Sequence, residues 1–206
     1  MKRQFFFLVL IFNFHLAFAE SASDSLAKQL SHVVTFSSDF TQEVLGEKDE
    51  VLQHSVGSMQ FNRPSLFYWH VVSPSPQTMW YRNNTLIVYD PELAQATSKK
   101  VYSKKDPSLL PLMLLTGDAA SVLKNFSVEF VDKKYILKPI PDEKDTLLIG
   151  VILMLNSDGA VREIQYQTTL GQKTKITFEH VNVNKKLDKA IFFEPLPKDT
   201  DIVHVE

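Results

Sequence analysis

The stretch FNRPSLFYWH, residues 61–70, places one arginine among aromatic residues. Side chains alternate between the two faces of a β-strand, so Arg63 shares a face with Met59 and Phe61, while its sequence neighbours point the other way. A guanidinium on an apolar face is costly unless its N–H donors find acceptors. We therefore expect Arg63 to bind main-chain carbonyls left free where the proline-interrupted helical segment of residues 109–115 ends, with a position at the rim in water as the alternative.

Pro64 follows this arginine and has no amide hydrogen to donate within a sheet. We expect it either to end the pairing of the strand or to form a bulge. In both cases Pro64 would fix the direction in which Arg63, and then Phe67 and Trp69, are aimed.

Chemistry other than binding has little support in the sequence. The patterns typical of nucleotide loops, serine hydrolases, zinc peptidases and calcium loops do not occur. The carboxylates Asp142, Glu143 and Asp145 indicate a solvated turn rather than a catalytic pair. The histidines after residue 19 are scattered without metal-ligand spacing, at positions 32, 54, 70, 180 and 204. We expect no enzyme activity, no metal and no cofactor; a hydrolase whose site evades known motifs is a less favoured alternative.

Residues 1–19 resemble a signal peptide. Lys2 and Arg3 precede an apolar run from Phe5 to Phe12, and Ala17-Phe18-Ala19 provides a cleavage site. The apolar run is shorter than the ~20 residues that span a membrane. The sequence therefore predicts export and cleavage after Ala19 rather than a membrane anchor.

Composition is typical of one globular domain, which we place at residues 20–206. The chain is 44% hydrophobic and 22% charged. Its formal net charge of −2 becomes −4 once Lys2 and Arg3 are removed, which argues against a nucleic-acid partner. The chain has no cysteine, so it has neither a disulfide nor the residue on which bacterial lipoproteins are acylated. We expect a soluble monomer in the periplasm.

Hydrophobic periodicity predicts a mainly β protein with a few helices (α+β). Leu26, Leu30, Val33 and Val34 have helical spacing, whereas apolar residues alternate from Phe36 to Tyr102. Further strands are expected over 126–131, 135–139, 146–155, 161–169, 173–180 and 191–194. A sheet this large tends to curl. We expect an incomplete antiparallel β-barrel of about eleven strands, with helices over its open side.

The segment between residues 109 and 115 is rich in leucine but cannot form a long helix. It contains Pro111 and is soon followed by Gly117, so we expect one or two weakly anchored helical turns. We call this segment the lid. It consists of Leu109, Leu110, Pro111, Leu112, Met113, Leu114 and Leu115.

Several short stretches, taken in order, are similar to those of the LolA family of periplasmic outer-membrane lipoprotein carriers. They cover almost the whole chain after residue 19, and the pattern R-P-x-L-F-x-W is the most specific. The matching residues are FTQEV (40–44), Gly57, NRPSLFYWH (62–70), Pro74, NNTLIVYDPELAQAT (83–97), PLMLL (111–115), YILKP (135–139), Ile191, Phe193 and Pro195.

The resemblance implies an eleven-stranded incomplete barrel whose hydrophobic cavity takes the acyl chains of lipoproteins. It also implies two partners, namely an inner-membrane ABC transporter that releases the lipoprotein and an outer-membrane receptor that accepts it. The receptor shares the fold but is anchored, so the missing cysteine favours the carrier. With the strand parity above, we assign to the cavity wall Phe36, Phe40, Met59, Phe61, Phe67, Trp69, Met79 and Tyr81.

In the family the arginine matching Arg63 bonds the lid, which implies that Arg63 holds the lid closed. Ile87 departs from an aromatic that is usual in the family, which would change one cavity wall. The tail after Pro197 is short, which leaves its effect on the direction of transfer open. An alternative function on the same fold is a periplasmic sensor or regulator that binds an apolar ligand as a signal.

Overall fold

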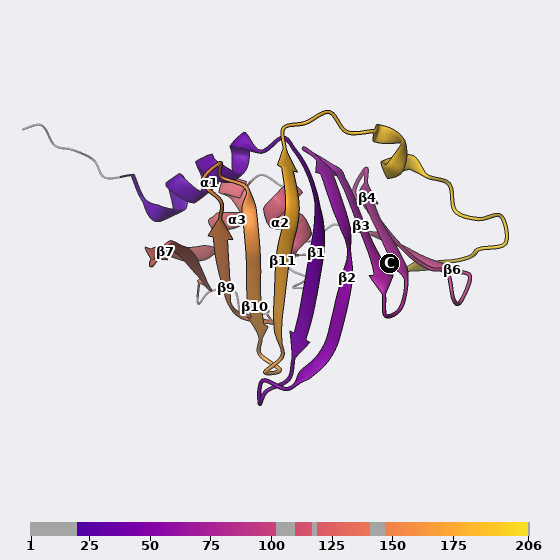
Figure 1. Cartoon of the computed structure of the whole chain (residues 1–206), viewed down its shortest axis with the longest axis horizontal. Helices are drawn as coiled ribbons and strands as arrows, with labels where there is room; N and C mark the ends of the chain where they lie inside the picture. Colours follow the sequence, from indigo (N-terminus) through magenta and orange to yellow (C-terminus); the bar gives the residue numbers. More distant parts are fainter. Residues whose placement is uncertain (1–19, 102–109, 117–118, 141–146, 206) are drawn as a thin grey trace, which may run out of the picture.

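The computed structural model describes residues 20–101, 110–116, 119–140 and 147–205 (Figure 1). The proposed signal peptide, residues 1–19, therefore lies outside the described residues. The described chain forms one curved sheet with helices α1 (Ala22–His32), α2 (Leu110–Thr116) and α3 (Ala119–Leu123) and the 3-10 helix η2 (Lys189–Phe193). No helix within these ranges is long and apolar enough to cross a membrane.

Twelve strands form a single open sheet in the order β12-β6-β5-β4-β3-β2-β1-β11-β10-β9-β8-β7. Neighbouring strands are antiparallel, except that β12 runs parallel to β6. The expected mainly β fold with an incompletely closed sheet is confirmed. The strands are β1 (Thr35–Leu45), β2 (Val51–Asn62), β3 (Leu66–Ser73), β4 (Gln77–Arg82), β5 (Thr85–Asp90), β6 (Gln95–Lys100), β7 (Phe126–Val131), β8 (Lys134–Pro139), β9 (Leu148–Leu155), β10 (Val161–Thr168), β11 (Lys173–Val183) and β12 (Asp201–Val205).

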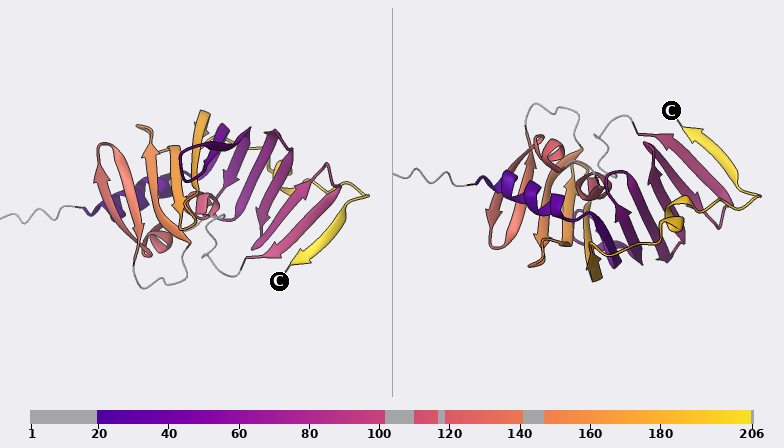
Figure 2. Two further views of the ribbon diagram at one scale, coloured as in Figure 1. Left: turned by 90° about the horizontal axis from the view of Figure 1, so that it is seen from below. Right: turned by 90° about the horizontal axis from the view of Figure 1, so that it is seen from above.

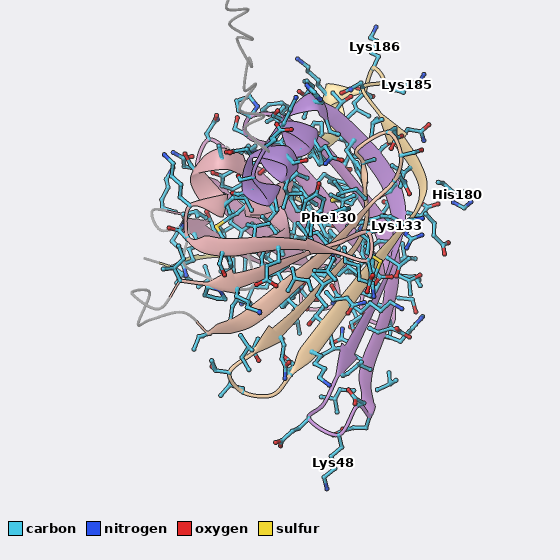
Figure 3. The ribbon with its side chains drawn as sticks, turned by 90° about the vertical axis from the view of Figure 1, so that its left-hand side faces the viewer. Lys48, Phe130, Lys133, His180, Lys185 and Lys186 are labelled. Carbon is cyan, nitrogen blue, oxygen red and sulfur yellow. The ribbon has the colours of Figure 1, made fainter. Side chains whose placement is uncertain are left out.

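The inner face of the sheet holds the main core. α2 and α3 lie on this face, whereas η2 lies on the opposite one (Figure 2). On β1 and β2 the side chains of Phe36, Phe40, Met59 and Phe61 are almost fully buried, as the alternating pattern predicts. The outer side is polar in many places, and Figure 3 shows His180, Lys185 and Lys186 projecting from it.

Helix α1 begins where Ser21 acts as its N-cap, because the Ser21 Oγ accepts a hydrogen bond of 3.0 Å from the Asp24 amide. Its apolar stripe buries Leu26 and Leu30, which join the main core. The helix contacts α3 and β7. Gln29 also donates a hydrogen bond of 2.6 Å to the hydroxyl of Tyr135 on β8.

Pro64 stands between the end of β2 and the start of β3, so pairing of β2 ends just before it. This is the first of the two roles expected for the residue. The turn directs β3 back along β2, with Phe61 opposite Phe67 and Met59 opposite Trp69. The aromatic residues after the turn therefore lie beside the apolar residues before it.

The C-terminal arm, residues 184–205, crosses the outer face of the sheet (Figures 1 and 2). The strand expected over residues 191–194 is wrong, because these residues belong to η2 and the segment after it. The Asp188 side chain caps η2 by accepting from the Ala190 amide at 2.9 Å. Phe192 is then buried against Tyr68 and Trp80 on the outer face.

Two side chains of β4 hold the arm in place. The Trp80 indole donates to the carbonyl of Ile191 at 2.9 Å, and Arg82 donates to the carbonyl of Phe192 at 2.6 Å. Ile87 packs in the same outer cluster. The expectation that Ile87 alters a cavity wall is therefore wrong, since strand alternation places it on the opposite face from the cavity.

Candidate ligand-binding cavity

Aromatic side chains form a continuous wall on the inner face of β1, β3 and β4. The rings of Phe40 and Trp69 stack with centroids 3.7 Å apart, and Trp69 lies opposite Met79 on the next strand. Gly57, on β2, leaves space for this stack, because a Cβ there would lie 2.8 Å from the Phe40 ring and would overlap the carbonyl oxygen of His70. Close packing of this wall therefore requires glycine at position 57.

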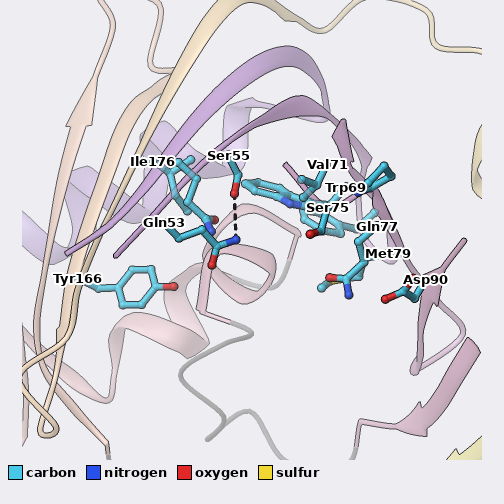
Figure 4. A pocket seen from close by; sticks show the side chains of 13 residues that line it. Gln53, Ser55, Trp69, Val71, Ser75, Gln77, Met79, Asp90, Tyr166 and Ile176 are labelled. Atoms are coloured by element: carbon cyan, nitrogen blue, oxygen red, sulfur yellow. Dashed lines mark hydrogen bonds between the residues drawn. The ribbon is translucent and has the colours of Figure 1, made fainter. Parts of the chain in front are cut away.

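A pocket of about 300 Å³ opens beside this wall (Figure 4). Its lining comes from the inner faces of β1 to β5, β10 and β11 and from the turn between β3 and β4. Apolar and polar side chains share the lining. They are Phe67, Trp69, Val71, Pro76, Met79 and Ile176, together with Gln42, Gln53, Ser55, Ser75, Gln77, Asp90 and Tyr166.

Of the eight predicted wall residues, Phe67, Trp69 and Met79 line this pocket. Phe40 lies behind Trp69 in the stack. Tyr81 is half-buried against the main core and donates its hydroxyl hydrogen to Asn84 at 3.0 Å. The remaining three, Phe36, Met59 and Phe61, are buried in the core.

The polar residues of the lining were not predicted, because only apolar and aromatic residues were assigned to the cavity wall. Gln42 follows Phe40 on the inner face of β1, and Asp90 follows Val88 on β5, so the same alternation could have found them. Gln53 donates a hydrogen bond of 3.0 Å to Ser55, which is 1% exposed. In the described part of the chain, no hydrogen bond engages the side-chain amide of Gln42 or Gln77.

Tyr166 lines the pocket on the side opposite Asp90 and Met79 (Figure 4). Burial raises the pKa of its hydroxyl above the ordinary value of 10.0, against a smaller opposing effect from its hydrogen bond with Thr174. Burial, with a smaller contribution from Glu194, likewise raises the pKa of Tyr68 on the outer face.

These raised pKa values predict a loss of stability in alkali. Above about pH 10 an unfolded tyrosine loses its proton while the folded one keeps it, so the native state binds more protons and the free energy of unfolding falls with pH. The stabilising effect is complete below pH 10 and is lost as pH rises through the raised pKa. Urea unfolding between pH 8 and 11 measures this effect. The free energy of unfolding should fall less steeply with pH for Tyr166→Phe, and for Tyr68→Phe, than for the parent; an unchanged slope contradicts this account.

The lid forms α2 and packs closely on the inner face. Leu114 is 0% exposed and Leu115 is 2% exposed, while Met113 is partly buried against the same core. Leu109 lies outside the described residues, and the side chains of Leu110 and Leu112 are not described. The helix contacts β2 and β3, so the described lid leucines are anchored more firmly than Pro111 suggested.

Arg63 lies near the C-terminal end of α1. Its Nε donates to the carbonyl of Val33 at 2.8 Å and its Nη2 to the carbonyl of Leu30 at 3.0 Å. The guanidinium carbon also lies 5.6 Å from the centre of the Phe61 ring. A positive group at a helix C-terminus is favoured, so these contacts stabilise the junction of α1 and β2.

These two bonds end on α1, so a bond from Arg63 to the lid stays a prediction. Arg63 and the lid do meet around a small enclosed cavity of about 10 Å³, which both Arg63 and Leu115 line. Phe36 and Phe61 line it as well. Movement of Leu115 would therefore change the surroundings of the guanidinium.

No group of three or more His, Cys, Asp or Glu side chains that could hold a metal ion occurs among residues 20–101, 110–116, 119–140 and 147–205.

An open curved sheet with a helix packed on its inner face and a partly apolar inner pocket defines a half-barrel fold with a candidate site for an apolar ligand. A family model described as "Outer membrane lipoprotein carrier protein LolA" matches residues 31–193. The outer-membrane lipoprotein carrier protein of Azotobacter vinelandii is 32% identical over 188 residues, which is 89% of this chain and 88% of the relative. That of Pseudomonas fluorescens is 31% identical and covers 86% of each chain.

Among solved structures, an uncharacterized conserved protein from Thermus thermophilus has a TM-score of 0.58 at 9% identity. The match covers 90% of this chain and 100% of that one, and it shows the fold alone. The family model and the two carrier relatives identify this chain as a member of the LolA family.

Proposed function

We propose that this protein is a soluble periplasmic carrier of lipoproteins. It binds the acyl chains of a lipoprotein released from the inner membrane and transfers them to a receptor at the outer membrane. The observation that carries the proposal is the inner pocket, where the aromatic wall of Phe67 and Trp69 is open to a ligand. Membership of the family and the names of the relatives support the same role.

The size of the pocket indicates how cargo enters. A volume of about 300 Å³ is at the lower end for pockets that bind small ligands, and two or three long acyl chains need more. The main space on the inner face is occupied by the lid leucines Leu114 and Leu115. Cargo binding therefore requires that acyl chains displace α2 and take over its apolar contacts.

The energetics favour partial burial of the cargo. Each methylene that leaves water contributes about 0.8 kcal/mol, so complete burial of several chains would make release very slow. The displaced lid opposes binding, because its leucines lose their own buried contacts while cargo is present. The net affinity for cargo is therefore lowered, which allows the complex to release its cargo to the receptor.

The partners follow from the proposed route. An inner-membrane ABC transporter supplies the lipoprotein, and an anchored outer-membrane receptor accepts it. The chain has no nucleotide-binding loop pattern, so the ATP would be used by the transporter. Export requires the signal peptide, and the mass of the mature protein should correspond to a chain that begins at Glu20.

The test is to mix the purified mature protein with an acylated lipoprotein and isolate a soluble complex. We expect a stoichiometric complex, chemically unchanged cargo and onward transfer to receptor-bearing vesicles. Cleaved cargo would indicate a hydrolase, and binding without transfer would indicate a sensor. Lipoprotein that lacks its acyl chains should not bind.

Val71 and Val72 supply a matched pair of variants on β3. Val71 lines the pocket, whereas its neighbour Val72 is 56% exposed and points to the outer side. Val71→Lys places a charge where acyl chains must lie and should reduce complex formation at least ~10-fold. Val72→Lys should leave complex formation unchanged, and equal effects of the two variants would contradict the assignment of the cavity.

A further inference from the structure

The pocket is not the uniformly apolar space that acyl chains alone would require. Three glutamines, two serines and a tyrosine line it together with the aromatic wall. These side chains carry no net charge but offer N–H and O–H donors. Ester and amide carbonyls are neutral acceptors, and they join the acyl chains to the N-terminal cysteine of a lipoprotein. The polar part of the pocket therefore fits the neutral linkage region of the cargo.

One member of the lining differs from the rest. Asp90 is the only charged residue among the thirteen described residues that line the pocket. Its side chain lies beside Gln77 and Met79 (Figure 4). It forms no ion pair with any residue in the described ranges, so no cation among those residues neutralises its negative charge.

The local backbone fixes the position of this carboxylate. Asp90 ends β5, and its Oδ1 accepts hydrogen bonds from the amides of Glu92 at 2.9 Å and Leu93 at 3.1 Å. These bonds form the turn into β6. They would be kept by asparagine, whose side-chain oxygen can accept in the same way. The turn alone therefore does not require a charged residue here.

A carrier that moves between two membranes meets many lipids that have acyl chains but are not cargo. Anionic phospholipids have two acyl chains and a phosphate, so an apolar wall by itself would accept them. A fixed negative charge in the pocket lining repels a phosphate. Specificity of this kind depends on a group that opposes the wrong ligand.

We infer that Asp90 is a specificity residue that excludes anionic phospholipids from the cavity, while the neutral polar lining accepts the ester and amide groups of an acylated cysteine. This inference rests on the proposed carrier function, because it assigns roles within the same pocket. It concerns which amphiphile the pocket accepts rather than whether acyl chains bind at all.

The two tryptophans allow a direct binding assay. Trp69 lines the pocket and Trp80 lies on the outer face, so Trp80→Phe leaves Trp69 as the sole indole reporter. Two brominated probes would be titrated against this protein, namely phosphatidylglycerol and a synthetic N-acyl-diacylglyceryl-cysteine peptide with neutral residues. Quenching of Trp69 by bromine gives the affinity for each probe. The measured quantity is the ratio of the two affinities.

We expect the parent to prefer the lipopeptide and Asp90→Asn to reduce that preference by ~5-fold or more. Asp90→Lys should reduce it further, because a cation at this position attracts phosphate. Asp39→Asn is the matched control: it removes an exposed carboxylate that pairs with His180 at 2.8 Å on the outer side, and it should leave the ratio unchanged.

The outcomes separate the two proposals. If neither probe quenches Trp69, the carrier function itself is wrong. If the lipopeptide binds but the ratio is the same for the parent and Asp90→Asn, the role of Asp90 is wrong and the carrier function stands. If Asp90→Asn reduces the ratio but added salt leaves the ratio of the parent unchanged, the cause is not electrostatic.

Discussion

Arg63→Leu is expected to lower the free energy of unfolding by about 2–3 kcal/mol and to impair delivery of cargo more than its uptake. The variant loses the bonds to the carbonyls of Leu30 and Val33, and hydrogen bonds to a charged group contribute about 1.5–3 kcal/mol each when buried. The expected loss is smaller than the sum of the two contributions because the arginine is only partly buried. Urea unfolding measures the first effect, and timed transfer to receptor-bearing vesicles measures the second.

The expected defect in delivery follows from the shared cavity of Arg63 and Leu115. We expect the guanidinium to favour closure of the lid. Its loss should therefore keep the lid open and the cargo bound for longer. Arg82→Leu is the control, since Arg82 also donates to a main-chain carbonyl and lies 5.5 Å from a phenylalanine ring, but on the outer face. That variant should lose stability and transfer cargo normally. Normal transfer by Arg63→Leu would refute the prediction that Arg63 holds the lid closed.

Gly57→Ala should be among the most damaging single substitutions in the sheet, with a cost of about 3 kcal/mol or more in the free energy of unfolding. The added Cβ would overlap the carbonyl oxygen of His70, which is main chain and cannot rotate away. It would also meet the Phe40 ring at 2.8 Å. Because Phe40 stacks on Trp69, the strain should narrow the pocket and weaken acyl-chain binding as well.

Gly150→Ala provides the comparison at another strand position. A Cβ at Gly150 would lie 3.4 Å from the nearest atom, the carbonyl oxygen of Leu137, which is an ordinary contact. Thermal and urea unfolding should place this variant within about 1 kcal/mol of the parent. Equal losses for the two glycine variants would mean that the close approach at Gly57 is not the cause.

Strand parity was enough to place the main apolar residues. Alternation along β2 correctly placed Met59 and Phe61 on the apolar face of the sheet, although they are buried in the core and do not line the pocket. Parity could not identify the acceptors of Arg63, because they lie on α1, some 30 residues earlier in the chain. Contacts between distant segments depend on how the helices dock, and no local pattern encodes this.

The end of the chain was the least predictable part. Ile191 and Phe193 share a strand-like spacing, yet the buried residue between them is Phe192, which packs on Tyr68 and Trp80. Burial of Phe192 on the outer face of the sheet favours η2 over a strand at this place. β12 had no clear signal because every residue of that strand is exposed, so it lacks the apolar alternation that marks a half-buried strand.

The parallel pairing of β12 with β6 also sets an order of events during folding. Gln95 and Asp201 meet across 106 positions of sequence. β6 is therefore an unprotected edge until residues 201–205 have joined it, and bare strand edges recruit other chains into aggregates. β12 then becomes the outermost strand on this side, so the segment that covers β6 also sets the exposed edge of the folded sheet.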